Sequence, residues 1–294
     1  SPSEFRASQM NLVLHLGDKV SAEEALERFH QLIEFGQRYP SRIIVLCPDE
    51  AISAGSMRAK LFSQCYIGAS HREMCCCEAL ILGYQSDDCE LLGNQVSVWL
   101  ESDLPTYHWF NRMPARRIEA YFDNLLVGAR RCIYDSSIET EDLAALDWPE
   151  PERVGDLAQA RLLPVRQAIG QYLSGYPIEA ICRGLESVRI RHAASMSGEG
   201  KGLQQWIKAC LSECDKCDTC SGLKAKFELG KCHSPDCLLN LELEYSDERS
   251  FSWKMSKGGD LGQIEDALGK SGVSVTTRVK PLGAEQTIAE ALLF

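Results

Sequence analysis

The cysteines between residues 210 and 237 are the side chains in this sequence best suited to chemistry. The stretch CLSECDKCDTCSG (210–222) holds four of them and KCHSPDC (231–237) holds two more. Cysteine thiolates bind zinc, and closely spaced cysteines form redox-active dithiols. Which of these chemistries applies depends on the elements that position the sulfur atoms.

The first part of this stretch continues a helical pattern. Apolar residues recur at helical spacing from Leu203 through Trp206, Ile207 and Leu211, and Cys210 and Cys214 fall on the same stripe. A stripe of this kind faces a protein core. We therefore expect Cys210 and Cys214 to act as small apolar residues.

The remaining cysteines allow three interpretations. Cys217 and Cys220 form a C-x-x-C pair near a predicted helix end, and Cys232 and Cys237 follow as a C-x4-C pair. Two such pairs can supply four thiolates to a structural zinc ion. Alternatively Cys217 pairs with Cys220, or Cys214 with Cys217, as a redox dithiol, or all of these thiols remain unligated. The sequence leaves these alternatives open.

Familiar catalytic motifs are missing. The turn after the first predicted strand, GDKVSAEE (17–24), has one glycine where a dinucleotide-binding loop has three. SGEGKG (197–202) resembles a phosphate loop, but its spacing fails the P-loop pattern, so a flexible loop is the preferred interpretation. No hydrolase elbow, metalloprotease or kinase signature occurs. The sequence therefore shows no familiar catalytic constellation.

Two weaker candidates remain. His71 could pair with Cys75 as a nucleophile, but alternation along a strand places Cys75 and Cys77 on one face of a buried sheet, where cysteine is an ordinary small apolar residue. Asp135 and Ser136 end a predicted strand, either at a ligand site or at a simple turn.

The first half of the chain predicts an α/β domain. NLVLHL (11–16) and RIIVLC (42–47) read as strands around a helix at 21–38, which opens with the capping box formed by Ser21 and Glu24. Further strands are expected at 57–67, 75–84, 104–110 and 131–136, and helices at 88–102 and 116–129. This alternation is typical of a mostly parallel sheet with helices on its faces.

The second half predicts an α+β domain. A stretch rich in proline and charge at 147–156 favours a boundary that gives domains 1–148 and 149–294. Helices are expected at 157–174 and 202–213, and a strand at 186–193. Four later segments alternate polar and apolar residues and predict an antiparallel sheet: LKAKFELG, LLNLELEYS, RSFSWKMS and VSVTTRVK.

Composition narrows the choice of partner. The 294 residues carry a formal net charge of −11, which argues against nucleic acid or an anionic membrane as a main partner. No window approaches the length of a membrane span, and residues 1–20 lack the pattern of a secretory signal. Fourteen cysteines without such a signal favour reduced thiols, a metal or redox control in the cytoplasm over a disulfide framework.

Several segments together resemble the OpcA family of glucose-6-phosphate dehydrogenase assembly proteins. The segments are RYPSRIIVLCPDE, CCCEALIL, SDLPTYHWFNRMP, CIYDSS and LQQWIKACL, in the family's order, with Tyr39 where the family has histidine. The resemblance implies a non-catalytic protein that binds glucose-6-phosphate dehydrogenase, promotes its active oligomer in the oxidative pentose phosphate pathway, and in some members responds to thioredoxin.

The expected partner surface is the segment DLPTYHWF (103–110), because exposed aromatic residues are typical anchors of interfaces. Tyr107, Trp109 and Phe110 are its candidate contacts, with core packing as the alternative for Trp109 and Phe110. Arg42 and Asp135 complete the predicted set, as scaffold or pocket residues. The competing hypotheses are an α/β enzyme acting on a small phosphorylated or sugar substrate near Asp135, and a module controlled by zinc or by thiols.

Overall fold

The computed structural model divides into two units, one at each side of Leu157, with the C-terminal helix belonging to the first. The structure describes residues 8–67, 74–85, 89–100, 102–212, 225–256, 258, 260–269 and 272–294. The first unit consists of Ser1–Leu157 and Ala284–Phe294, and the second of Ala158–Gly283. The α/β and α+β classes expected for the two halves are confirmed.

The division differs from the predicted boundary at residue 148. Strand β7 (Val154–Asp156) adds to the first unit by pairing in parallel with β6 (Arg131–Tyr134). The last helix, α8 (Ala284–Leu293), returns to this unit, where the Arg131 guanidinium donates a hydrogen bond to the Ala291 carbonyl. Composition can mark a linker but not a chain that crosses back, so this return of α8 to the first unit could not be expected from the sequence.

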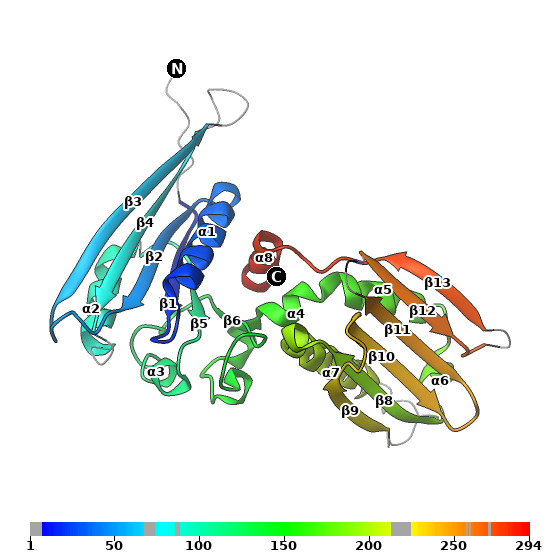
Figure 1. Cartoon of the computed structure of the whole chain (residues 1–294). Coiled ribbons are helices and arrows are strands. Elements are labelled where there is room, and N and C mark those ends of the chain that lie inside the picture. Colours follow the sequence, from blue (N-terminus) through cyan, green and yellow to red (C-terminus); the bar gives the residue numbers. More distant parts are fainter. Residues whose placement is uncertain are drawn as a thin grey trace. The chain divides into compact units, whose positions relative to one another are not determined.

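The first unit is built on a seven-stranded sheet in the order β3-β4-β2-β1-β5-β6-β7 (Figure 1). All neighbouring strands are parallel except β3, which pairs antiparallel with β4. The uninterrupted apolar runs of β1 and β2 suit strands that are buried on both faces. The strands not yet given are β1 (Met10–Leu16), β2 (Ser41–Pro48), β3 (Met57–Ile67), β4 (Met74–Tyr84) and β5 (Thr106–Asn111).

Helices cover this sheet. Helix α1 (Ala22–Arg38) contacts β2 and β4 and also α8, while α2 (Cys89–Trp99) and α3 (Ala115–Glu119) pack on the core formed around Val13, Ile44 and Phe110. Short 3₁₀ turns occupy Leu143–Ala145 and Pro151–Arg153. The helix predicted at 116–129 ends early, because Asp123 and Asn124 favour turns and Gly128 has a positive φ.

The second unit is built on a six-stranded sheet in the order β13-β12-β11-β10-β8-β9. Its strands are antiparallel except for the parallel pair β8 and β9. The bounds are β8 (Leu185–His192), β9 (Lys226–Lys231), β10 (Cys237–Tyr245), β11 (Ser250–Ser256), β12 (Leu261–Asp266) and β13 (Val273–Arg278). Strand β12 was missed by the sequence analysis.

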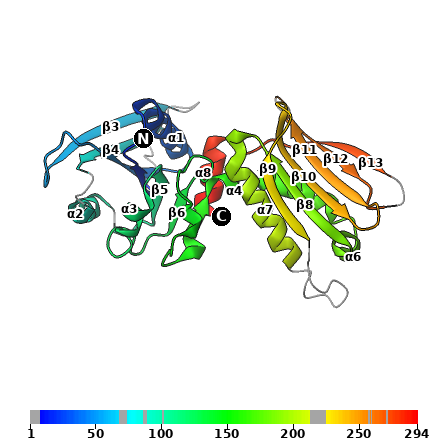
Figure 2. The same ribbon diagram turned by 60° about the horizontal axis from the view of Figure 1, so that its bottom comes forward.

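Helices lie against one face of this second sheet and leave the other face open (Figure 2). The covered face buries Val188, Leu241 and Trp253 against helical residues such as Val165 and Ile207. The open face carries the alternate, polar residues of the same strands. The helices of this part are α4 (Leu157–Arg161), α5 (Leu163–Leu173), α6 (Ile178–Cys182) and α7 (Ser197–Ser212), with a 3₁₀ turn at Ala194–Met196.

The SGEGKG segment is helical. Residues 197–202 form the first turns of α7, so neither the phosphate loop nor the flexible loop is found. A Cβ at Gly200 would lie 2.7 Å from the His192 ring, and one at Gly202 would lie 2.9 Å from Gln159. The glycines therefore serve close packing of α7 on its neighbours. Among the described residues, no helix is long and apolar enough to cross a membrane.

Candidate functional site

In an open parallel sheet, ligands bind beyond the carboxyl ends of the strands where the strand order reverses. Here that point lies between β1 and β5, because β2 flanks β1 on the other side. Gly17 and Asp18 follow β1, and Arg112 follows Asn111 at the end of β5. The side chains around these four residues decide whether a ligand can enter.

Arg112 fills this position. Its Nε donates hydrogen bonds to both carboxylate oxygens of Glu24, each at 2.9 Å, and its Nη1 donates to the Ile138 carbonyl at 2.9 Å. Its backbone N–H donates to Oε1 of Glu139 at 2.9 Å. Arg112 has a φ of 53°, in the left-handed region. Four contacts to three other residues hold it in that conformation.

Further contacts close the same crevice. The Arg28 Nε donates to Oδ1 of Asn111 at 2.9 Å, and Nδ2 of Asn111 donates to Oε1 of Glu24 at 3.3 Å. Beside them, the Arg117 guanidinium donates to both carboxylate oxygens of Asp18, at 3.0 and 2.7 Å. The polar groups at the strand ends thus satisfy one another, and the position where related folds bind ligands is occupied by the chain's own side chains.

The capping box expected at the start of α1 is half formed. The Ser21 hydroxyl accepts a hydrogen bond from the Glu24 backbone N–H at 3.1 Å, as expected. The Glu24 carboxylate binds Arg112 and Asn111 instead of the helix start. A charged guanidinium competes better for a carboxylate than an exposed backbone N–H does.

Asp135 and Ser136 form a turn after β6. The Asp135 carboxylate accepts from the Ser137 backbone N–H at 3.1 Å, and Ser136 donates from its N–H and hydroxyl to Asp156 at 3.0 and 2.6 Å. The predicted turn is therefore present. Burial, with Asp135 and Glu24 nearby, raises the pKa of Glu139 to about 7.

Two histidines pair inside the first unit. His15 Nε2 lies 2.9 Å from His108 Nδ1, and both side chains are fully buried. His15 Nδ1 and His108 Nε2 have no hydrogen-bond partner among the described residues. Burial lowers the pKa of His108 to about 3, and burial followed by the proximity of His108 lowers the pKa of His15 well below its usual value. Both rings are neutral in the folded protein, which suits packing better than proton transfer.

The predicted partner surface needs a correction. Tyr107, Trp109 and Phe110 lie within β5 and are 7%, 2% and 0% exposed, so they form core and not an exposed anchor. A strand buried on both faces has no exposed side, which the mixed pattern of this segment did not reveal. Two exposed apolar residues lie just before this strand in sequence, Val98 and Trp99 at the end of α2. Sequence reasoning missed both.

Arg42 contacts this end of α2. Its Nη1 donates to the Trp99 carbonyl at 3.0 Å and so binds one of the carbonyl groups that a helix end leaves without a partner. The predicted scaffold role of Arg42 thus has a specific contact. Arg42 lies near the amino end of β2, whereas Asp135 follows the carboxyl end of β6. The two residues therefore lie at opposite edges of the parallel strands, and the structure does not bring them together.

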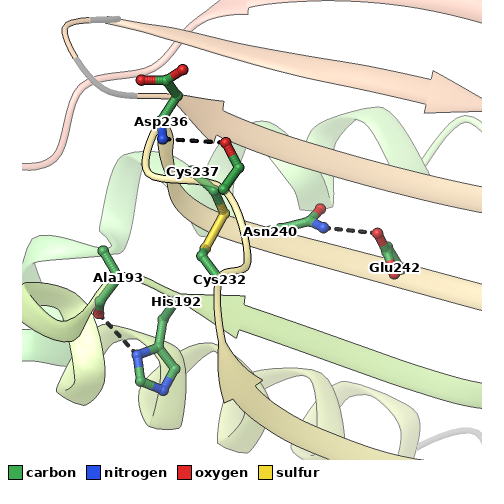
Figure 3. Close-up of a disulfide and its surroundings, with 8 residues drawn as sticks. His192, Ala193, Cys232, Asp236, Cys237, Asn240 and Glu242 are labelled. Carbon is green, nitrogen blue, oxygen red and sulfur yellow. Dashed lines mark hydrogen bonds between the residues drawn. A yellow bond between two sulfur atoms is a disulfide. The ribbon is translucent and has the colours of Figure 1, made fainter.

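The cysteines of the second unit divide into described and undescribed residues. Cys232 and Cys237 form a disulfide across the loop between β9 and β10 (Figure 3). In this state their sulfur atoms cannot serve as thiolate ligands, so the zinc set would require their reduction. Cys210 is exposed, which corrects its expected core position. Cys214, Cys217 and Cys220 lie outside the described residues, and their redox or metal role stays a prediction.

The structure does not describe the side chains of the predicted nucleophile pair. His71 and the side chain of Cys75 fall outside the described part of the chain. Cys77, the next residue on that face of β4, is buried, and a Cβ at Gly36 would lie 2.8 Å from its sulfur. Cys77 thus packs against α1 as a small apolar residue, as expected.

Sequence reasoning missed the residues that define the crevice. Glu24 was assigned to a cap, while Arg112 and Glu139 were not singled out, and neither was the buried pair of His15 and His108. Local spacing carries no signal for them, because their partners are distant in sequence. Together, the fold and this crevice define an α/β domain whose usual ligand position is filled from within, followed by an α+β domain.

Part of the chain is similar to known proteins. Residues 34–148 match the family model described as "Glucose-6-phosphate dehydrogenase subunit N-terminal domain". A Synechocystis sp. protein named "Putative OxPP cycle protein OpcA" is 34% identical over 131 residues, which cover 42% of this chain and 27% of that protein. The chain therefore matches only about a quarter of the relative's length. This part of the chain is therefore similar to the N-terminal domain of the OpcA family.

Solved structures add little. A crystal structure titled as a putative oxidoreductase from Bacteroides fragilis is aligned over 98% of this chain and 89% of that chain, with a TM-score of 0.39 and 9% sequence identity. A likeness of this level supports no conclusion about fold or activity.

Proposed function

We propose that this protein is a non-catalytic partner of glucose-6-phosphate dehydrogenase that favours the enzyme's active oligomer. The observation that carries the proposal is the family match over residues 34–148, whose description names a subunit of that enzyme. The filled crevice supports it, because Arg112, Glu24 and Asn111 occupy the position where an α/β enzyme would hold its substrate.

The mechanism we propose is differential binding. A protein partner shifts an enzyme toward one conformation only by binding that conformation more tightly than the others. A preference of about 3 kcal/mol changes the ratio of two states by roughly two orders of magnitude. No catalytic group of the partner is needed for this effect.

The contact surface we assign to the dehydrogenase is the end of α2. Val98 and Trp99 are 76% and 45% exposed there, within the residues that match the family. Tryptophan is among the residues that contribute most to binding energy at protein interfaces. The hydrogen bond from Arg42 to the Trp99 carbonyl stabilises the backbone that carries this ring.

The test is direct mixing. Purified protein is added to glucose-6-phosphate dehydrogenase from the same organism, and the enzyme's kinetics and oligomer size are measured together. We expect activation accompanied by a larger or more stable oligomer. No change in either quantity would refute the proposal.

The surface is tested by paired variants. Replacement of Val98 and Trp99 by alanine should weaken binding at least tenfold, as expected for a central aromatic anchor. Leu26→Ala is the matched control, since Leu26 is 54% exposed on α1 and lies outside the matched residues. Equal binding by both variants would place the interface elsewhere while leaving the proposed function intact.

A further inference from the structure

A pocket lies on the open face of the second unit's sheet, far in sequence from the residues that match the family. It has a volume of about 490 Å³, which is within the usual range for small-molecule sites. Side chains of β8, β10 and β11 and the disulfide-closed loop 232–237 line it. Figure 3 shows this loop beside Asn240 and Glu242 of β10.

Asn240 forms the floor of the pocket and is only 8% exposed. Its Nδ2 donates a hydrogen bond to Oε1 of Glu242 at 2.8 Å, while its Oδ1 has no partner among the described residues. This orientation of the amide is fixed, since a carboxylate accepts hydrogen bonds and cannot donate them. A buried acceptor is thus left unmatched beside the cavity, and native structures rarely leave such groups without a donor.

Two cations flank this acceptor across the sheet. Asn240 lies directly opposite Arg191 of β8 and Lys254 of β11. The Arg191 guanidinium is 3.7 Å from Glu228, and the Lys254 ammonium is 3.9 Å from Glu265. Both distances exceed hydrogen-bonding range, so both groups retain donors for a ligand. A Cβ at Gly230 would lie 2.4 Å from Arg191 Nη1, so the absence of a side chain there leaves room for the guanidinium.

The other charged residues that line the pocket do not neutralise the positive charges of Arg191 and Lys254. Arg189 is engaged by Glu244 through hydrogen bonds of 2.6 and 2.5 Å. Glu242 accepts from Asn240, and its second oxygen lies 3.7 Å from Arg189. Asp236 is exposed on the loop, where solvent screens its charge.

From this arrangement we propose that the pocket binds a small organic anion that also carries a hydroxyl group. Arg191 and Lys254 hold the anionic group, and the hydroxyl donates its hydrogen bond to Oδ1 of Asn240. A carboxylate and a phosphate both satisfy the two cations. The site is therefore defined by the pairing of anion and hydroxyl, and the experiment distinguishes the two anionic groups.

The test uses two matched pairs of probes on the full chain. L-malate is compared with succinate, which lacks only the hydroxyl, and glycerol 3-phosphate with propyl phosphate. Binding is followed by proton–nitrogen correlation spectra at probe concentrations up to about 10 mM, where a millimolar Kd remains measurable. We expect shifts at the amides of Asn240, Lys254 and residues 232–237. The hydroxylated member of the preferred pair should bind about tenfold more tightly.

Two variants test the hydroxyl-binding part and the anion-binding part of the site separately. Asn240→Leu should remove the preference for the hydroxylated probe, because it removes the acceptor at similar volume. Lys254→Gln should weaken both members of a pair by a similar factor and preserve the preference. Lys201→Gln is the control, since Lys201 is an exposed residue of α7. This helix packs on the covered face of the sheet, whereas the pocket lies on the open face. The Lys254 variant keeps the test informative even if the Asn240 variant fails to fold.

Three results would overturn the proposal. They are no shift from any probe, equal binding of the members of both pairs, and binding that neither variant alters. The first would mean that solvent satisfies Asn240. None of these results bears on the dehydrogenase, because the pocket and the end of α2 belong to different units.

Discussion

Arg112 and Glu24 are separated by 88 residues in sequence, yet the Arg112 Nε lies 2.9 Å from both oxygens of the Glu24 carboxylate. The contact joins the residue after β5 to the first turn of α1 at the point where the strand order reverses. A ligand-binding α/β domain keeps this point open. Here an internal ion pair closes it, so we expect the pair to contribute to stability.

Loss of the arginine should therefore destabilise the first unit. Arg112→Asn removes the guanidinium and retains a residue that tolerates the positive φ. The unfolding free energy should fall by about 2 kcal/mol, because Glu24 is left partly buried without its partner. Urea unfolding, with hydrogen exchange of the β1 and β5 amides, measures this. Arg116→Asn, at an exposed residue of α3, should change stability by less than about 0.5 kcal/mol. Equal effects of the two changes would contradict the role given to the pair.

A glycine is required at position 17 because the chain segments after β1 and β5 approach each other closely there. A Cβ on Gly17 would lie 1.9 Å from the Arg112 carbonyl oxygen, and backbone atoms cannot rotate away as a side chain can. Gly17→Ala should cost about 3 kcal/mol or more, seen as a lower urea midpoint or as loss of folded protein. At Gly283 a Cβ would meet no atom within 4 Å, so Gly283→Ala is the matched control. A neutral Gly17→Ala would show that the β1 and β5 ends can separate without cost.

The buried histidines should make stability depend on pH. Their pKa values are lowered in the folded protein, to about 3 for His108, against 6.5 in the unfolded chain. The unfolded chain therefore binds more protons below pH 6.5, and stability falls as the pH falls through that value. Between pH 7.5 and 5, His108 alone should account for a loss of about 2 kcal/mol.

His108→Leu should reduce this dependence. Unfolding free energies of the variant and the parent protein are compared at several pH values between 7.5 and 5. His30→Ala is the control, because His30 is exposed on α1. If the parent and His108→Leu lost the same stability on acidification, the pair would not be buried and neutral as the structure shows.

The sequence predicted what local pattern can encode. The apolar runs of β1 and β2, the cap at Ser21 and the amphipathic α1 all formed as expected. Strand β12 escaped because it buries few strongly apolar residues: Ile264 stands between polar Gln263 and Glu265, and Gly262 contributes only space for Trp253. The helix predicted at 116–129 ends at Glu119, because Asp123, Asn124 and Gly128 favour turns. The composition of this segment indicated these turns only weakly.

The candidate sites were less predictable because they depend on long-range pairing. The aromatic residues of β5 looked like an exposed motif, but the strand is central in its sheet and both faces are covered. Arg191, Asn240 and Lys254 meet only through the register of three strands. Neither relationship has a signature in spacing along the chain, since register is set by the whole sheet.

Glu139 should oppose the histidines in its effect on stability. Burial raises its pKa from 4.5 to about 7, so the folded protein holds its proton where the unfolded chain does not. Its contribution is present at low pH and is lost as the pH rises from 4.5 through 7. Glu139→Gln keeps an oxygen for the Arg112 N–H and carries no charge. The variant should gain up to about 3 kcal/mol over the parent at pH 8 and little at pH 4.5. Glu119→Gln, at an exposed residue of α3, should show no such gain.

The disulfide between Cys232 and Cys237 should stabilise the loop that borders the open-face pocket. A bridge that closes a loop this short restricts the unfolded chain enough to contribute about 2 kcal/mol. Replacing both cysteines by serine should lower the unfolding free energy by that amount. Hydrogen exchange should then rise at residues 232–237 before it rises in β10. Cys210→Ser is the control, because Cys210 lies on α7 and not in the loop that the bridge closes. If reductant left the loop amides of the parent unchanged while the double variant exchanged faster, serine itself and not the lost bridge would be the cause.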